Sequence, residues 1–267
     1  MPAIHNLAGR AAIITGASSG IGAASARAFA AHGVHLTLGG RDAPRLLALA
    51  RSLPQLPLLV PGDLRVAGTS EVLVARAIAA WGRLDVLVAN AGAGLAAPVL
   101  ATARADLDAL FALNLHAPLE LIQAALPHMP RGGRVIVVSS VVGLRALPYA
   151  GAYAASKAAL DCLIEALRVE VRDRGITVSL VRPSTTATAF TDHERGAGRA
   201  VRRVSPAGVA PARVAQVIVR CAQHGPRVAW VRRRDRLLVL ASLLFPGITD
   251  ALLAHGVRWA VGGGRIP

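Results

Sequence analysis

Short apolar runs alternate with longer Ala-rich stretches along most of the chain. The runs are apolar at nearly every position, which is typical of strands buried on both faces of a parallel sheet. They predict strands at 11–15, 34–38, 57–60, 84–88, 134–139 and 176–181. The stretches between them predict helices at 20–32, 42–52, 69–81, 102–126, 151–174 and 209–223.

The order of these elements predicts the fold class. Strands that alternate with helices indicate an α/β protein built on a doubly wound parallel sheet. The sequence shows no domain linker and no internal repeat, so we expect a single domain over 1–231. Residues 184–208, rich in Thr, Gly and Arg, are expected to form a loop. Residues 232–267 are expected to form a basic and apolar C-terminal helical tail of the same domain.

Charge distinguishes the C-terminal part of the chain. The 267 residues carry a formal net charge of +15, and residues 191–267 alone hold 13 basic and 4 acidic residues, a net charge of +9. A basic region of this kind suits anionic lipid, nucleic acid or acidic substrates. The sequence has no interleaved aromatics, zinc-ligand spacing or RNA-binding signature. We therefore expect no nucleic-acid partner and no metal site.

Cysteine usage and the N-terminal residues bear on location. The only cysteines, Cys162 and Cys221, form no CxxC pair, which indicates a reducing compartment. The first ten residues contain no apolar run typical of a secretory signal. These features favour a cytoplasmic location, with peripheral contact at the inner membrane surface left open.

The segment ITGASSGIG at 14–22 lies between the first predicted strand and the first predicted helix. Its glycines, Gly16, Gly20 and Gly22, permit a tight turn and a close approach of the backbone to a pyrophosphate. The following helix offers unpaired N–H groups to the same phosphate oxygens. An ordinary tight turn has the same composition, but the strand before it and the helix after it favour a dinucleotide site.

The segment YAASK at 153–157 holds the only lysine of the chain, which has 29 arginines. On a helix, Tyr153 and Lys157 share a face one turn apart. A free tyrosine has a pKa of about 10. A nearby cation lowers that pKa by favouring the phenolate, which suits general acid–base catalysis at neutral pH. The alternative is a chance Tyr and Lys on an Ala-rich helix.

The order and spacing of further motifs resemble the short-chain dehydrogenase/reductase family. The motifs are the glycine turn, GDL at 62–64, ANAG at 89–92, NL at 114–115, SS at 139–140, YAASK at 153–157 and RPSTTAT at 182–188. Ala89 and Ser184 stand where the family has Asn and Gly. The resemblance covers residues 10 to about 230 and implies a Rossmann-like fold with about seven strands, the seventh within 227–231.

The resemblance also implies roles for the site residues. Ser140 and Tyr153 would hold the substrate oxygen, and Tyr153 would transfer the proton. Lys157 would bind the nicotinamide ribose, and Asn114 would hold a water that links Lys157 to solvent. The cofactor-binding residues implied in the same way are Gly16, Ser18, Ser19, Gly20, Ile21, Gly22, Asp63, Leu64, Asn90, Ala91, Gly92, Tyr153, Lys157, Pro183, Thr186 and Thr188. The implied reaction interconverts a small-molecule carbonyl and a secondary alcohol by hydride transfer.

The residues after the second predicted strand bear on the choice of cofactor. Dinucleotide folds that bind NAD use an acid here for the ribose 2′-hydroxyl, whereas an arginine suits the 2′-phosphate of NADP. The chain has Gly40 at this place and then Arg41, whose guanidinium can pair with a phosphate. The sequence therefore favours NADP(H), and Asp42, one residue later, keeps NAD(H) open.

The substrate and the assembly are less defined by the sequence. A 3-oxoacyl thioester reductase and a catalytically silent NADPH-binding regulator stay as alternatives. The resemblance implies that the loop at about 184–208 is a lid over the substrate. The arginines within 189–208 would attract an acidic substrate, or else be solvated charges on a loop. The resemblance implies a homodimer or homotetramer that pairs through the helices at 102–126 and 151–174.

The tail combines basic and apolar residues. Arg232, Arg233, Arg234 and Arg236 precede an apolar run at 237–245. This run is far shorter than the roughly 20 residues that span a bilayer. Basic residues beside apolar helices suit the surface of an anionic membrane. The alternative is that the tail helices cover the substrate pocket or an oligomer face.

Overall fold

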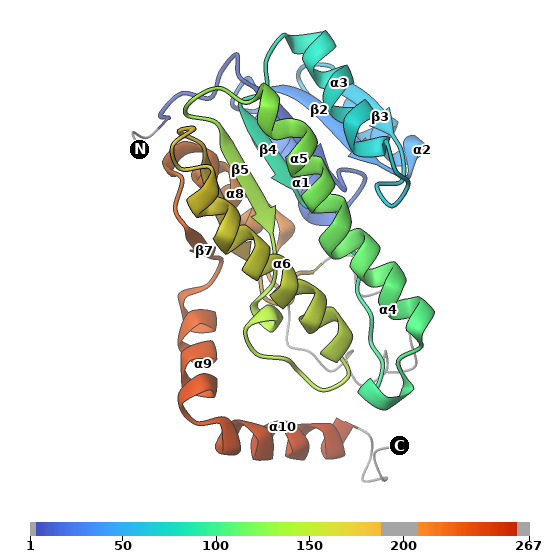
Figure 1. Cartoon of the computed structure of the whole chain (residues 1–267), viewed down its shortest axis with the longest axis vertical. Helices are drawn as coiled ribbons and strands as arrows, with labels where there is room; N and C mark the ends of the chain where they lie inside the picture. Colours follow the sequence, from blue (N-terminus) through green and yellow to red (C-terminus); the bar gives the residue numbers. More distant parts are fainter. Residues whose placement is uncertain (1–3, 188–207, 261–267) are drawn as a thin grey trace.

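The computed structural model describes residues 4–187 and 208–260, with side chains up to Arg258 (Figure 1). Its centre is a seven-stranded parallel sheet in the order β3-β2-β1-β4-β5-β6-β7. The strands are β1 (Ala11–Thr15), β2 (His35–Gly40), β3 (Leu58–Pro61), β4 (Val86–Ala89), β5 (Arg134–Val138), β6 (Thr177–Arg182) and β7 (Val228–Trp230). The predicted doubly wound sheet with seven strands is confirmed.

Helices cover both faces of this sheet, as Figure 1 shows. One face carries α1 (Gly20–Ala30), α2 (Ala43–Arg51) and α8 (Pro211–His224). The opposite face carries α3 (Thr69–Trp81), α5 (Ala117–Ala125) and α6 (Gly151–Glu170). Neighbouring strand residues alternate between the two cores, so that Ile13 lies in one and Ile14 in the other. Both cores need apolar side chains, which explains the continuous apolar runs.

The strand order reverses between β1 and β4. The chain moves outward from β1 to β2 and β3, and then returns to place β4 on the other side of β1. In open parallel sheets, ligands bind in the crevice outside the carboxyl ends of the strands at such a reversal. The glycine turn follows β1, and the ANAG segment follows β4, so both predicted cofactor motifs border this crevice.

The predicted helix at 102–126 differs from expectation in its interior. It consists of α4 (Arg104–Phe111) and α5, joined by a π-helical segment, η2 (Ala112–His116). Short π segments inside α-helices are frequent at functional sites. This segment holds the Asn114 side chain fully buried.

The C-terminal tail leaves the sheet after β7. It forms α9 (Arg233–Leu244) and α10 (Pro246–Ala260), with a bend of 112° between them. In Figure 1, α9 leads away from the sheet and α10 crosses below the end of the molecule that carries α4 and the start of α6. The predicted single domain with a helical tail is confirmed.

Candidate active site

The glycine turn after β1 closes against the segment that follows β4. Gly16 has a φ of 65°, in the left-handed region that favours glycine. A Cβ on Gly16 would lie 3.0 Å from the Cα of Ala91, and a Cβ on Gly22 would lie 2.2 Å from the carbonyl oxygen of Gly16. Neither position tolerates a side chain without a shift of the backbone. In the described structure, the Ser19 side chain caps none of the first N–H groups of α1, so these groups can receive a phosphate.

Asn90 fastens the glycine turn to β4. Its Nδ2 donates a hydrogen bond of 2.9 Å to the carbonyl oxygen of Thr15. The backbone N–H groups of Asn90 and Ala91 donate to the Thr15 hydroxyl at 3.0 and 3.1 Å. Sequence analysis missed Thr15 as a site residue. Its only signal is a hydroxyl residue at the end of an otherwise apolar strand.

Arg41 follows the end of β2, and the carboxylate next to it in the sequence, that of Asp42, is engaged elsewhere. Asp42 is the N-cap of α2: its Oδ1 accepts a hydrogen bond of 2.9 Å from the backbone N–H of Arg45, and its Oδ2 lies 3.3 Å from the Arg45 Nε. The Asp42 carboxylate therefore serves the helix start. Among the residues that the structure describes, none forms an ion pair with Arg41 within 4.0 Å.

Asp63, one of the predicted cofactor-binding residues, forms an ion pair with Arg65. The Arg65 guanidinium donates to the two carboxylate oxygens at 3.0 and 2.5 Å. This hydrogen bonding lowers the pKa of Asp63 to about 2, and the charge of Arg41 acts in the same direction. Asp63 therefore stays ionised at neutral pH. Arg65 is a second basic residue of this region that sequence analysis missed.

Ser140, Tyr153 and Lys157 lie where the end of β5 meets α6. Ser140 begins the short 3₁₀ helix η4 (Val141–Gly143), and Tyr153 and Lys157 lie one turn apart on α6. The three residues are 8%, 8% and 4% exposed. Val142 of η4 and Tyr153 belong to one apolar cluster. The structure thus brings the predicted acid–base residues together.

Gly143 allows this close approach of η4 to α6. A Cβ on Gly143 would lie 3.2 Å from the backbone nitrogen of Ala158 and 3.3 Å from the Cβ of Lys157. A side chain here would push the turn that carries Ser140 away from the catalytic helix. Sequence analysis missed this positioning residue, although a glycine three residues after Ser140 is a visible signal.

The Ser140 hydroxyl is held weakly. It donates to the carbonyl oxygen of Pro183 at 3.5 Å and accepts from the backbone N–H of Val142 at 3.4 Å. Both distances are at the long end for a hydrogen bond. The hydroxyl can therefore exchange these contacts for a substrate oxygen at small cost.

Lys157 is buried with its ammonium at the carboxyl end of β5. Its Nζ donates a hydrogen bond of 3.1 Å to the carbonyl oxygen of Val138. Burial lowers the pKa of Lys157 to about 8, and the nearby carboxylate of Asp161 opposes that shift. A Cβ on Gly92 would lie 3.6 Å from Nζ. The missing side chain therefore keeps space beside the ammonium at the crevice.

Asn114 ties the segment after β4 to the catalytic helix. Its Nδ2 donates at 3.0 Å to both the Ala93 carbonyl oxygen and the Ser156 hydroxyl, and its Oδ1 accepts from the Ala93 N–H at 2.9 Å. The Ser156 hydroxyl in turn donates to the Tyr153 carbonyl oxygen at 2.8 Å. Sequence analysis missed Ser156. The proposed role of Asn114 as a water ligand stays a prediction.

The RPSTTAT segment follows β6 and is described as far as residue 187. The Pro183 carbonyl oxygen accepts from the Val141 N–H at 3.1 Å, which ties the end of β6 to η4. Thr186 forms a parallel bridge with Val209. Thr188 and the rest of the predicted lid lie outside the described residues, so the role of Thr188 stays a prediction.

Two of the other predicted cofactor residues have side chains that pack into the cores. The Ile21 side chain packs against one core, and the Leu64 side chain is buried in the other. A cofactor contact from either would come from its main chain. The Ser18 hydroxyl points toward Gly40, since a Cβ on Gly40 would lie 3.5 Å from it. It therefore lies on the Arg41 side of the crevice.

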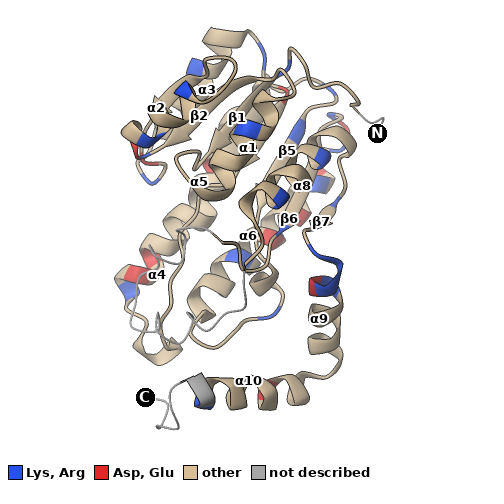
Figure 2. Cartoon of the chain, turned by 180° about the vertical axis from the view of Figure 1, so that it is seen from behind, with Lys and Arg blue, Asp and Glu red and all other residues tan. Residues whose placement is uncertain are grey.

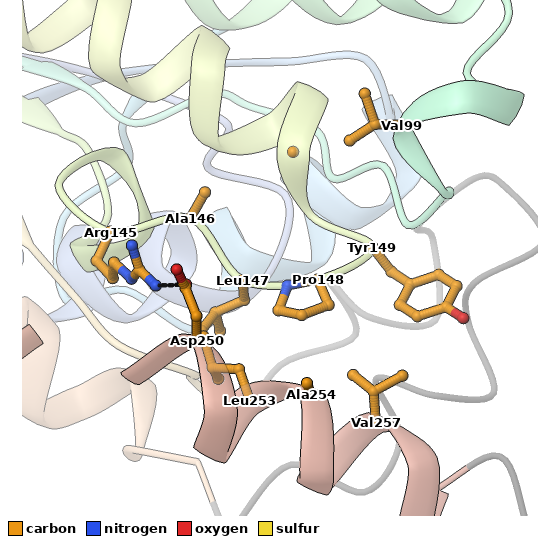
Figure 3. A pocket seen from close by; sticks show the side chains of 11 residues that line it. Val99, Arg145, Ala146, Leu147, Pro148, Tyr149, Asp250, Leu253, Ala254 and Val257 are labelled. Atoms are coloured by element: carbon orange, nitrogen blue, oxygen red, sulfur yellow. Dashed lines mark hydrogen bonds and ion pairs between the residues drawn. The ribbon is translucent and has the colours of Figure 1, made fainter. Parts of the chain in front are cut away.

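A pocket of about 450 Å³ lies between the segment 145–149 and α10 (Figure 3). Its walls are mostly apolar, and an ion pair between Arg145 and Asp250 crosses one side. Tyr149 lines it with a φ of 63°, an uncommon conformation outside glycine. Neither Ser140 nor Tyr153 lines this pocket. It is a space beside the catalytic group rather than the reaction centre.

The residues of the crevice fit a nicotinamide dinucleotide. The turn leaves no room for side chains where a pyrophosphate would approach, the start of α1 offers N–H groups, and the one lysine borders the crevice. Within 4–187 and 208–260, no group of three His, Cys, Asp or Glu side chains is arranged to hold a metal ion. The chemistry available to the site is hydrogen bonding and proton transfer around a bound cofactor.

The chain is similar to known proteins over most of its length. Residues 10–198 match a family model described as short chain dehydrogenase. Oxidoreductase asL5 from Sarocladium schorii is 34% identical over 198 residues, which cover 73% of this chain and 80% of that protein.

Two solved structures share the fold. A short chain dehydrogenase from Burkholderia cenocepacia in complex with NADP is 30% identical, with a TM-score of 0.75 over 85% of this chain and 97% of that one. A short chain dehydrogenase/reductase from Burkholderia phymatum in complex with NAD has a TM-score of 0.84 over 92% of this chain and 97% of that one. The second is 21% identical and shows the likeness of fold alone.

Proposed function

The chain belongs to the short-chain dehydrogenase/reductase family of oxidoreductases, and on this premise we propose that it uses NADP(H) to interconvert a carbonyl and a secondary alcohol. The observation that carries the proposal is the burial of Ser140, Tyr153 and Lys157 together at the end of β5 and on α6. These groups supply the hydrogen bonds and the proton that such a reaction requires.

The reaction follows from the groups at the site. When bound, the nicotinamide would supply or accept the hydride. The Ser140 hydroxyl and the Tyr153 phenol would bind the carbonyl oxygen. Tyr153 would donate its proton to that oxygen as negative charge develops there, and would take the proton back during alcohol oxidation. The Lys157 ammonium would favour the phenolate that results.

Arg41 supports the choice of NADP(H). Gly40 places no carboxylate at the end of β2, Asp42 is engaged as a helix cap, and Arg41 has no ion-pair partner among the described residues. Its guanidinium is therefore available to a 2′-phosphate. The NADP complex of the Burkholderia cenocepacia protein adds a relative with the same cofactor.

Exchange of this arginine tests the cofactor preference. Arg41→Ser should raise the KM for NADPH about 10–100-fold, since one charge-assisted hydrogen bond contributes about 1.5–3 kcal/mol. The KM for NADH should change little. Arg45→Ser is the matched control, because Arg45 is already paired with Asp42. Equal effects on NADPH and NADH would contradict the proposed role of Arg41.

A substrate screen tests the reaction itself. NADPH oxidation by the full chain should be measured with ketones, aldehydes, steroids and acyl thioesters, together with an NADH series. Turnover of a ketone supports the proposal, and turnover of aldehydes alone would contradict it, because their products are primary alcohols. Turnover of acyl thioesters alone would favour the 3-oxoacyl alternative. Tight NADPH binding without turnover of any carbonyl would favour the silent regulator.

A further inference from the structure

The C-terminal helix pair exposes a concentration of large apolar side chains. Eight of them within 237–252 are between 46% and 73% exposed. They are Leu237, Leu238, Leu240, Leu243, Leu244, Phe245, Ile248 and Leu252. Isolated exposed leucines are ordinary, but a contiguous apolar patch marks a contact surface.

Helix α9 buries two polar side chains beside one valine and exposes all five of its leucines. Its buried residues are Asp235, Val239 and Ser242, whereas its leucines at 237, 238, 240, 243 and 244 are exposed. A helix that covered its own core would do the opposite. Burial within this chain therefore does not explain the leucines of α9.

Basic residues form a band beside this apolar surface. Arg232 is partly exposed, Arg233, Arg234 and Arg236 are exposed, and Asp235 between them is buried. In Figure 2, the start of α9 is blue, while the rest of α9 and most of α10 are tan. Positive charge thus lies at one end of α9, and the elbow between α9 and α10, residues 243–248, is apolar.

The lengths of the helices exclude a simple span. Helices α9 and α10 have 12 and 15 residues with a bend of 112° between them, whereas a bilayer requires about 20 residues in one helix. The continuous helix Arg104–His128 is long and apolar enough by composition, but half of its apolar window is buried, and its α5 part lies in the core. Together, α9 and α10 are long and apolar enough by composition for a broken span or a re-entrant loop, but α10 pairs with Arg145 through Asp250 and lines a pocket of the protein. We therefore place the membrane contact of the tail at the interface.

We propose that α9 and α10 dock this enzyme on an anionic lipid bilayer. The apolar elbow enters the boundary between headgroups and acyl chains, and the arginines at the start of α9 face the anionic headgroups. Charge complementarity favours an anionic bilayer over a second copy of the chain as the partner of this surface. A second copy of this chain would carry the same arginines and the same net charge of +15, whereas anionic headgroups carry the opposite charge.

The other side of α10 faces the enzyme. Asp250 pairs with Arg145, and Leu253, Ala254 and Val257 line the pocket beside the segment 145–149 (Figure 3). Docking thus involves a helix whose inner face contacts the loop between Ser140 and Tyr153. The proposal does not depend on the proposed reaction, because lipid binding is measured without turnover.

Flotation of the full chain with vesicles tests the proposal. With vesicles of equal parts phosphatidylglycerol and phosphatidylcholine at low salt, the protein should float with the lipid. It should stay at the bottom with phosphatidylcholine alone, and high salt should weaken the binding. A full chain that does not float with the phosphatidylglycerol vesicles overturns the proposal.

Two pairs of matched variants separate the apolar from the charge contribution. Leu244→Ser/Phe245→Ser/Ile248→Ser should abolish flotation. Leu56→Ser/Val66→Ser/Leu100→Ser, which changes three apolar residues outside the tail that are similarly or more exposed, should not. Arg233→Gln/Arg236→Gln should weaken vesicle binding about tenfold or more, and Arg51→Gln/Arg76→Gln, with the same change in net charge, should not.

The remaining outcomes also decide the question. Equal losses in the tail variants and in their controls would show nonspecific adsorption and overturn the proposal. Sizing of the same proteins by light scattering tests the second copy. If the triple tail variant turns an oligomer into a monomer and the wild type does not bind vesicles, the surface belongs to a protein–protein contact and the proposal is wrong.

Discussion

Helices α6 and α9 both bury polar side chains, but they use the rest of their surface differently. Helix α6 also buries Leu160 and Ile164 in the core beneath the sheet, alongside Tyr153 and Lys157. Helix α9 buries Asp235, Val239 and Ser242 and exposes its leucines. The polar groups of α6 are held in place by apolar burial around them. The leucines of α9 are exposed, so they do not hold that helix against the protein. This indicates that they serve a contact outside the chain.

The largest expected difference in stability comes from replacing a buried acid on each helix. Asp161 on α6 accepts hydrogen bonds of 2.8 and 3.1 Å from Arg182, and both side chains are almost fully buried. Asp161→Asn leaves the Arg182 charge poorly compensated and should lower the free energy of unfolding by about 3–5 kcal/mol.

The corresponding change on α9 should leave the free energy of unfolding nearly unchanged. Asp235 is also buried, but its ion-pair contact with Arg234 is 4.0 Å long and its Oδ2 has no hydrogen-bond partner among the described residues. Asp235→Asn therefore breaks no short ion pair and should not lower the free energy of unfolding by more than about 1 kcal/mol. Urea denaturation of both variants measures the contrast. Similar losses for the two would break the distinction between the helices.

The next largest difference in stability is expected from truncating one leucine on each helix. Leu160 is 2% exposed and Leu238 is 66% exposed. Leu160→Ala should lower the free energy of unfolding by about 3 kcal/mol through lost burial and the cavity left behind. Leu238→Ala should change it by less than about 0.5 kcal/mol. A loss of 2 kcal/mol or more for Leu238→Ala would mean that a folded contact covers α9 in solution.

The burial of Lys157 on α6 should also make the free energy of unfolding depend on pH. Burial lowers its folded pKa from 10.5 to about 8, so the unfolded chain binds more protons between these values. Stability from this group therefore rises with pH from about 8 to 10.5. The free energy of unfolding of the wild type minus that of Lys157→Met should increase over this window and stay flat below it. A constant difference up to pH 10.5 would contradict the lowered pKa.

Much of the fold could be predicted from the sequence, because each strand carries apolar residues toward both cores. All seven strands are present, and their ends lie within two residues of the predicted bounds. The site could be predicted because parallel strands end at one edge of the sheet. Motifs that follow β1, β4 and β5 therefore meet in space.

The contacts that hold the site together could not be predicted. The hydrogen bond from Asn90 to Thr15 joins residues 75 positions apart, and the Arg182–Asp161 pair joins residues 21 positions apart. No local pattern encodes either contact. The π segment around Asn114 likewise leaves no trace in hydrophobic periodicity. In the tail, the sequence predicted helices, but only the structure shows that the leucines of α9 are exposed.

The central claim is that Tyr153 transfers the proton. The chain has two tyrosines, and Tyr149 beside the pocket provides the control. On a substrate found by the NADPH-oxidation screen, Tyr153→Phe should lower kcat about 10²–10⁴-fold, while the Kd for NADPH, measured by fluorescence titration, changes less than about threefold. Tyr149→Phe should keep kcat within about tenfold. Retention of wild-type kcat by Tyr153→Phe would contradict the account.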